Sequence, residues 1–228
     1  MTYARAEQLT ADDATFYQTI LREFPRRGGP PDAAWLAAEA AARGLDAEAT
    51  LAHLAQHDLI VRDPATGTIR SMYPFSAAPT PHRVSVEGAR PVYAMCAVDA
   101  LGIPFMLERD AVIESLDPTT DMPIRVEVRG GEARWEPPTA AVLTASIEEA
   151  QGPKAISCCP VINFFATAEA AEAYRAAHPA VAGRVLTQEE AVAHGKRYFG
   201  GLLAPDGPTC GCDGEACGHR PPFERHVS

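Results

Sequence analysis

The chain has 228 residues, of which 46% are hydrophobic, and a formal net charge of −10. This size and composition suit a globular protein of one or two domains. The acidic balance disfavours general binding to nucleic acid, because phosphates require a basic protein face. No apolar run reaches the ~18–20 residues of a membrane-spanning helix, and the first residues lack the apolar core of a signal peptide. We therefore expect a cytoplasmic protein that binds neither nucleic acid nor membrane.

Residues 1–80 are predicted to be mostly helical. Two short strand patterns, 59–62 and 68–72, flank a turn and predict a hairpin, so this part resembles a winged helix. It carries 7 Arg and no Lys against 10 Asp and Glu, and we expect a scaffold or lid that does not bind DNA. Three helices are predicted here from their capping residues, Thr10, Asp32 and Asp46.

The composition changes after a proline-rich stretch at residues 76–81. Helical patterns begin at Thr167 and Thr187, and the first looks like a capping box. We expect an α+β fold, in which the winged-helix-like domain packs on an antiparallel sheet with peripheral helices. The expected divisions are residues 1–80, a catalytic domain over 81–204, and a cysteine-rich mobile tail over 205–228. Alternating patterns predict strands at residues 84–87, 111–115, 124–129 and 141–144.

Six cysteines are informative in a reducing compartment, where a disulfide framework is not expected. Cys158 and Cys159 are adjacent and cannot easily bridge each other. Together with the distant Cys96 they indicate a thiol site that folding assembles. The alternative is that these are ordinary buried cysteines.

Residues 91–104 are predicted to form a short helix on which Cys96 and Asp99 share a face. In the first turn, the helix dipole would favour the Cys96 thiolate, and Asp99 could relay its proton. The segment around Cys158 and Cys159 is apolar, and Phe164 and Phe165 are expected to close a dry pocket over these two thiols. The alternative for the first pair is a buried cysteine beside a solvated carboxylate.

The sequence resembles the organomercurial (alkylmercury) lyases. The resemblance lies in Arg90-Pro-Val-Tyr-Ala-Met-Cys96-Ala-Val-Asp99-Ala-Leu and in a cysteine five residues before the Phe164-Phe165 pair, and it covers roughly residues 30–200. It implies that Cys96 and Asp99 are catalytic. It also implies a second catalytic cysteine. In the family this is often the first cysteine of a Cys-Cys pair, which here would be Cys158. The spacing to Phe164-Phe165 instead indicates Cys159, and we assign the second catalytic role to Cys159.

The chemistry that the resemblance implies is protonolysis of a carbon–mercury bond in mercury detoxification. Thiolates are natural ligands of a soft cation such as Hg(II). Cys96 and Cys159 would bind mercury while Asp99 protonates the departing carbon. The three residues would then hold the Hg(II) product, without a cofactor, until mercuric reductase or small thiols accept it.

Several other functions compete with this interpretation. One is a non-catalytic protein that binds copper or mercury, and another is a metal-responsive winged-helix regulator. A third is an enzyme of the same fold that acts on another organometal. His53 and His57 have helical spacing, but Leu54 stands where a zincin motif has glutamate, so we expect an exposed helix face.

The end of the chain carries three further cysteines and a histidine among glycines and prolines, which predicts a mobile segment. We expect it to relay Hg(II) from Cys96 and Cys159. A structural zinc site with three cysteines and one histidine and incidental cysteines are the alternatives. The residues are Cys210, Cys212, Cys217 and His219.

Overall fold

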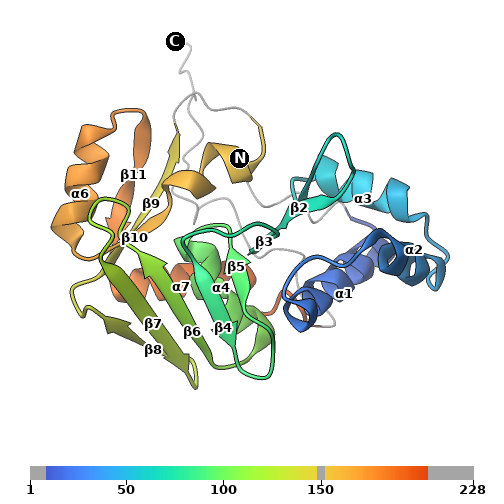
Figure 1. The fold of residues 1–228 in the computed structure, drawn as a ribbon, viewed down its shortest axis with the longest axis horizontal. Helices are drawn as coiled ribbons and strands as arrows, with labels where there is room; N and C mark the ends of the chain where they lie inside the picture. Colours follow the sequence, from blue (N-terminus) through green and yellow to red (C-terminus); the bar gives the residue numbers. More distant parts are fainter. Residues whose placement is uncertain (1–8, 148–151, 205–228) are drawn as a thin grey trace, which may run out of the picture.

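The computed structural model describes residues 9–147 and 152–204. Figure 1 shows three N-terminal helices at one side, a large sheet across the middle, and a smaller sheet with one helix at the other side. The N-terminal helices are α1 (Ala11–Arg27), α2 (Ala33–Ala41) and α3 (Ala47–Gln56). Their predicted caps are confirmed, because the side chains of Thr10, Asp32 and Asp46 each accept a hydrogen bond from the backbone N–H three residues later.

The predicted hairpin is confirmed as β1 (Ile60–Arg62) and β2 (Ile69–Met72), which pair antiparallel. It does not stand alone as a wing. β2 pairs with β3 (Phe75–Ser76), which pairs in turn with β5 (Val92–Ala94), so the hairpin is the edge of the main sheet. One sheet therefore spans the boundary expected near residue 80, and the domain division and the winged-helix likeness stay predictions.

The main sheet has eight strands in the order β1-β2-β3-β5-β4-β6-β7-β8, and all neighbours are antiparallel. The strands β6 and β7 alternate buried and exposed residues, as a sheet with one packed face requires. A second antiparallel sheet has the order β10-β9-β11. The remaining strands are β4 (Arg83–Val86), β6 (Ala111–Leu116), β7 (Pro123–Arg129), β8 (Glu132–Glu136), β9 (Ala141–Ile147), β10 (Asn163–Phe165) and β11 (Val181–Leu186).

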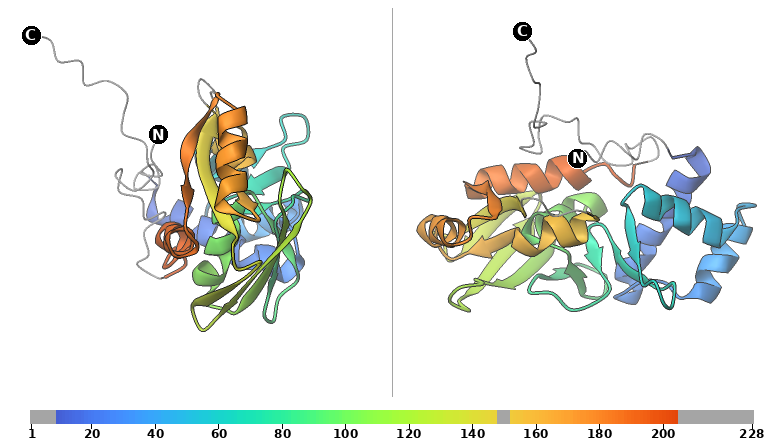
Figure 2. Two further views of the ribbon diagram at one scale, coloured as in Figure 1. Left: turned by 90° about the vertical axis from the view of Figure 1, so that its left-hand side faces the viewer. Right: turned by 90° about the horizontal axis from the view of Figure 1, so that it is seen from above.

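The α+β class is confirmed, and its centre is α4 (Ala97–Leu107), which is buried over most of its length. It packs against β4, β5 and β6 and against α7 (Gln188–Phe199) (Figure 2). The predicted helix over 91–104 was wrong at its start. Residues 92–94 pair with β3 and β4 as strand β5, so the helix begins only after Cys96.

Three shorter helical segments complete the described chain: α5 (Lys154–Ser157), the 3₁₀ turn η2 (Cys159–Val161) and α6 (Ala168–Ala177). The predicted capping box at Thr167 was wrong. The residue three positions after Thr167 is Ala170, whose side chain cannot accept a hydrogen bond from the Thr167 N–H. Thr187 and Glu190 form the box instead, at the start of α7. None of the helices in residues 9–147 and 152–204 has the length and apolarity to cross a membrane.

The contact between α4 and α7 depends on two glycines that face each other. A Cβ atom added at Gly195 would lie 2.8 Å from the Gly102 backbone nitrogen and 2.9 Å from the Leu101 carbonyl carbon. Both neighbours are backbone atoms and cannot rotate away. The close packing of the two helices, which fixes α4 beneath the sheet, therefore requires glycine at this position.

We expect Gly195→Ala to lower the free energy of unfolding by about 1–3 kcal/mol, the usual cost of overpacking a core. Ala193→Ser on the exposed face of α7 is the matched control and should change it by less than about 0.5 kcal/mol. Urea unfolding measures both. Equal midpoints for the two variants would show that the helices separate easily.

Candidate active site

Cys96 lies where β5 ends and α4 begins. It is the N-cap residue of α4 in an extended conformation, and its Sγ accepts a hydrogen bond from the Asp99 N–H at 3.4 Å. The N–H of Ala97 donates to the Ile162 carbonyl at 3.1 Å, which joins the start of α4 to the segment after Cys159. The junction between strand and helix thus aims the first thiol at the second cysteine segment.

Asp99 and Cys159 complete a cluster with Cys96. Asp99 is in the first turn of α4, and Cys159 begins the η2 turn. The Cys159 thiol donates to Asp99 Oδ2 at 3.9 Å, and one ligand atom from each of the three residues lies within 4.8 Å of the others. Only 3%, 2% and 4% of the surfaces of Cys96, Asp99 and Cys159 are exposed. Within the described residues, this is the only group of three metal-ligand side chains.

Burial controls the protonation of this cluster. It raises the pKa of the Cys96 thiol to about 11 and that of the Asp99 carboxyl to about 7. Cys159 donates hydrogen bonds to Cys158 and Cys96, and these bonds, followed by burial, raise the pKa of Cys159 well above its ordinary value. The hydrogen bond from the Asp99 N–H at the start of α4 lowers the pKa of Cys96, as predicted for a helix N-terminus, but burial raises it by more. Both buried thiols therefore favour the protonated form at neutral pH.

Cys158 lies outside this cluster. Its half-buried thiol donates to the Lys154 carbonyl at 3.5 Å. A hydrogen bond with Cys159 lowers the pKa of the Cys158 thiol. The structure therefore places Cys159, rather than Cys158, beside Cys96 and Asp99.

Two polar residues that the sequence analysis missed support the η2 turn. The Asn163 side chain donates to the Pro160 carbonyl at 3.1 Å and also hydrogen-bonds to His82. His82 is buried, and its Nδ1 atom hydrogen-bonds to Ser115 Oγ at 2.9 Å. Burial lowers the pKa of the His82 imidazole to about 4. This chain of neutral groups fixes the carbonyl next to Cys159. No motif in the sequence signals a supporting role for Asn163 or His82.

Phe164 and Phe165 do not act together over the thiols as expected. They are consecutive on β10, so their side chains point to opposite faces. Phe164 packs against Trp135 and His82 in the main core, which also contains Cys96 and Cys159. Phe165 packs in the core of the second sheet. Only Phe164 shares the apolar surroundings of the thiols.

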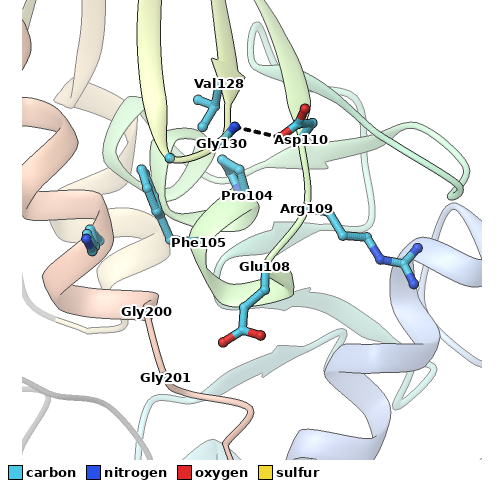
Figure 3. Close-up of a pocket in the computed structure, with 11 residues that line it drawn as sticks. Pro104, Phe105, Glu108, Arg109, Asp110, Val128, Gly130, Gly200 and Gly201 are labelled. Carbon is cyan, nitrogen blue, oxygen red and sulfur yellow. Dashed lines mark hydrogen bonds between the residues drawn. The ribbon is translucent and has the colours of Figure 1, made fainter.

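Two cavities among the described residues lie away from this cluster. The cavity in Figure 3 has a volume of about 440 Å³ and is lined by residues such as Phe105 and Glu108 at the C-terminal end of α4. In it, the Asp110 carboxylate accepts a hydrogen bond from the Gly130 N–H at 2.9 Å. The second, of about 750 Å³, adjoins it. Cys96 is at the other end of α4. The helix rises about 1.5 Å per residue, so Cys96 is about 16 Å from the end of α4 that lines the cavity.

His53 and His57 stand apart from the cluster, on and next to α3. Both histidines are half-buried, so the predicted exposed face was wrong. His53 Nδ1 donates to Asp13 at 2.9 Å, which ties α3 to α1. The Nε2 atoms of His53 and His57 are 3.0 Å apart at the end of α3. The C-terminal residues Cys210, Cys212, Cys217 and His219 lie outside the described residues.

Comparisons with known proteins agree with this geometry. The family model for alkylmercury lyase (MerB) matches residues 75–200. The alkylmercury lyase of Bacillus cereus is 33% identical over 118 residues, covering 52% of this chain and 53% of that protein. The one from Streptomyces lividans is 31% identical over 134 residues, covering 59% of this chain and 60% of that protein. The chain thus spans little more than half the length of these relatives.

A solved structure extends the likeness to nearly the whole fold. The mercury-bound form of MerB2 superposes with a TM-score of 0.72 at 25% sequence identity, and the match covers 88% of this chain and 96% of that one. The family match includes the segments that carry Cys96, Asp99 and Cys159. The resemblance read from the sequence is confirmed, and the chain belongs to the alkylmercury lyase family.

Proposed function

We propose that this chain is an organomercurial lyase, which splits a carbon–mercury bond by protonolysis into a hydrocarbon and Hg(II), in mercury detoxification. The observation that carries the proposal is the buried cluster of two thiols and one carboxyl within 4.8 Å. Two thiolates are the ligand set that a soft, two-coordinate cation prefers. A carboxyl with a pKa of about 7 can both accept and donate a proton near neutral pH.

The cluster supplies every proton that the reaction needs. The Cys96 sulfur bonds to mercury, and its proton passes to the Asp99 carboxylate and on to solvent. The Cys159 sulfur then forms the second bond to mercury, and its proton moves to Asp99 along the 3.9 Å contact. Two thiolates raise the electron density on the metal and on its carbon. Asp99 protonates that carbon, the carbon–mercury bond breaks, and the hydrocarbon leaves.

Mercury is substrate and product in this scheme, and the residues supply the rest of the chemistry without a cofactor. The Hg(II) product would be held by Cys96, Cys159 and Asp99. Its acceptors would be small thiols or mercuric reductase, in the cytoplasm, where thiols stay reduced. A relay through Cys210, Cys212 and Cys217 stays a prediction.

The same cluster would also hold a soft metal in a non-catalytic binding protein. Such a protein needs the thiols but no proton donor. Asp99 is buried with its carboxyl against Cys159, where it can take a proton from a thiol and pass it to a bound carbon, a role that a site for metal binding alone does not use. This placement favours the lyase.

The roles of the thiols are tested by single substitutions. We expect Cys96→Ser and Cys159→Ser each to abolish benzene release from phenylmercury, because one thiolate activates the carbon too weakly. Cys158→Ser is the matched control and should keep most activity, since its thiol is outside the cluster. Gas chromatography of benzene measures all three. An inactive Cys158→Ser beside an active Cys159→Ser would reverse the assignment of the second thiol.

The proton donor is tested by Asp99→Asn, which keeps the shape of the side chain and removes its acid. We expect phenylmercury still to bind through the thiols, while turnover falls ~10²–10⁴-fold, the usual effect of losing a general acid. Binding can be followed by mass spectrometry of the intact adduct, and turnover by benzene release. Turnover equal to that of the unsubstituted chain would remove Asp99 from the mechanism.

A further inference from the structure

The start of α5, the short helix before Cys159, is held by two side chains from the N-terminal part of the chain. Asp58 Oδ2 accepts a hydrogen bond from the Lys154 N–H at 3.2 Å, and Tyr73 Oη accepts one from the Ala155 N–H at 2.7 Å. These are the first two N–H groups of α5, which have no partner inside a helix. The N-cap residue is Pro153, whose side chain offers no acceptor. Asp58 and Tyr73 therefore cap α5 from 80 to 100 positions away.

The two capping side chains are themselves fixed. Tyr73 is fully buried, and its hydroxyl donates to Asp58 Oδ1 at 3.4 Å while it accepts from Ala155. The Tyr17 hydroxyl of α1 donates to the Tyr73 carbonyl at 2.9 Å. Burial first, and then the nearby Cys159, Asp58 and Asp99, raise the pKa of the Tyr73 phenol. The hydroxyl thus stays protonated and can donate and accept at once.

The other end of α5 leads directly to the second thiol. The helix has four residues, a length of about 6 Å. Its C-cap Cys158 donates its N–H to the Lys154 carbonyl at 3.1 Å, and its thiol donates to the same carbonyl. Cys159 follows at once. A shift of Lys154 therefore moves the whole turn that carries Cys159, whereas Cys96 is held separately by β5 and α4.

We propose that Tyr73 and Asp58 are positioning residues that hold Cys159 at the place where its sulfur and that of Cys96 bind one mercury ion. The inference rests on the proposed lyase function and adds a role for the N-terminal part of the chain. The first bond to mercury needs Cys96 alone. The second bond needs Cys159 within reach of the mercury. Loss of the Tyr73 and Asp58 contacts therefore slows cleavage of the carbon–mercury bond more than it weakens binding of the organomercurial by Cys96.

The test compares alkylation of the two buried thiols by iodoacetamide, without mercury, in a Cys158→Ser background. Tyr73→Phe removes the hydroxyl and keeps the ring. Asp58→Ala removes the carboxylate. Asp58→Asn keeps an oxygen acceptor and tolerates the left-handed backbone of Asp58 at φ 55°. Tyr174→Phe is the matched control, because its ring packs against Phe165 in the second sheet.

We expect Tyr73→Phe and Asp58→Ala to raise the alkylation rate of Cys159 roughly tenfold, the effect of losing one buried hydrogen bond. The alkylation rate of Cys96 should not change in either variant. Asp58→Asn and Tyr174→Phe should behave like the parent. Peptide mass spectrometry measures both rates. With phenylmercury, the first two variants should lower kcat and leave KM nearly unchanged.

Three results would overturn the proposal. One is an unchanged Cys159 rate in folded Tyr73→Phe, and another is a parallel rise at Cys96 and Cys159, which indicates general loosening. If Tyr73→Phe does not fold, the comparison of Asp58→Ala with Asp58→Asn decides, and equal Cys159 rates in these two contradict the proposal. Because alkylation needs no mercury, it separates failure of this inference from failure of the lyase function.

Discussion

Removal of Cys96, Asp99 and Cys159 from water is the constraint on which the rest of the site depends. Burial raises the pKa of the Cys96 thiol to about 11 and that of the Asp99 carboxyl to about 7, and hydrogen bonds to the other thiols, together with burial, raise that of Cys159. A hard cation cannot replace thiol protons in such a place, whereas a soft cation forms bonds to sulfur that repay the desolvation. Asp99 is the carboxyl in contact with Cys159, so in the proposed reaction a proton that leaves this thiol passes to it.

The fold buries these side chains by bringing together two segments that are about 60 residues apart in the sequence. β5 delivers Cys96 to the start of α4, and α4 stays in place because Gly102 and Gly195 let it pack closely on α7. The η2 turn delivers Cys159, supported by Asn163 on one side. On the other side, α5 is capped by Asp58 and Tyr73. The N-terminal part of the chain thereby contributes contacts to a cluster whose three side chains all come from later residues.

Local patterns in the sequence were sufficient for most secondary structure, whereas the resemblance to a family was needed to select Cys96, Asp99 and Cys159. The caps at Thr10, Asp32 and Asp46 and the alternating strands depend on neighbours in the chain, and they are confirmed. Features that depend on distant contacts were missed or wrong. Pairing of Val92–Ala94 with two other strands delays the start of α4. The contact of Tyr73 with Ala155 joins parts of the chain that no spacing rule connects.

The central claim is that this chain transfers a proton to carbon while two thiols take the mercury. Cleavage of phenylmercury in buffered D₂O, with a small thiol in excess and no added cofactor, tests it most directly. The account predicts benzene that carries one deuterium, in equal amount to the Hg(II) released, because the proton comes from exchangeable groups. Intact phenylmercury bound to the protein without benzene, or benzene that carries no deuterium, would contradict it.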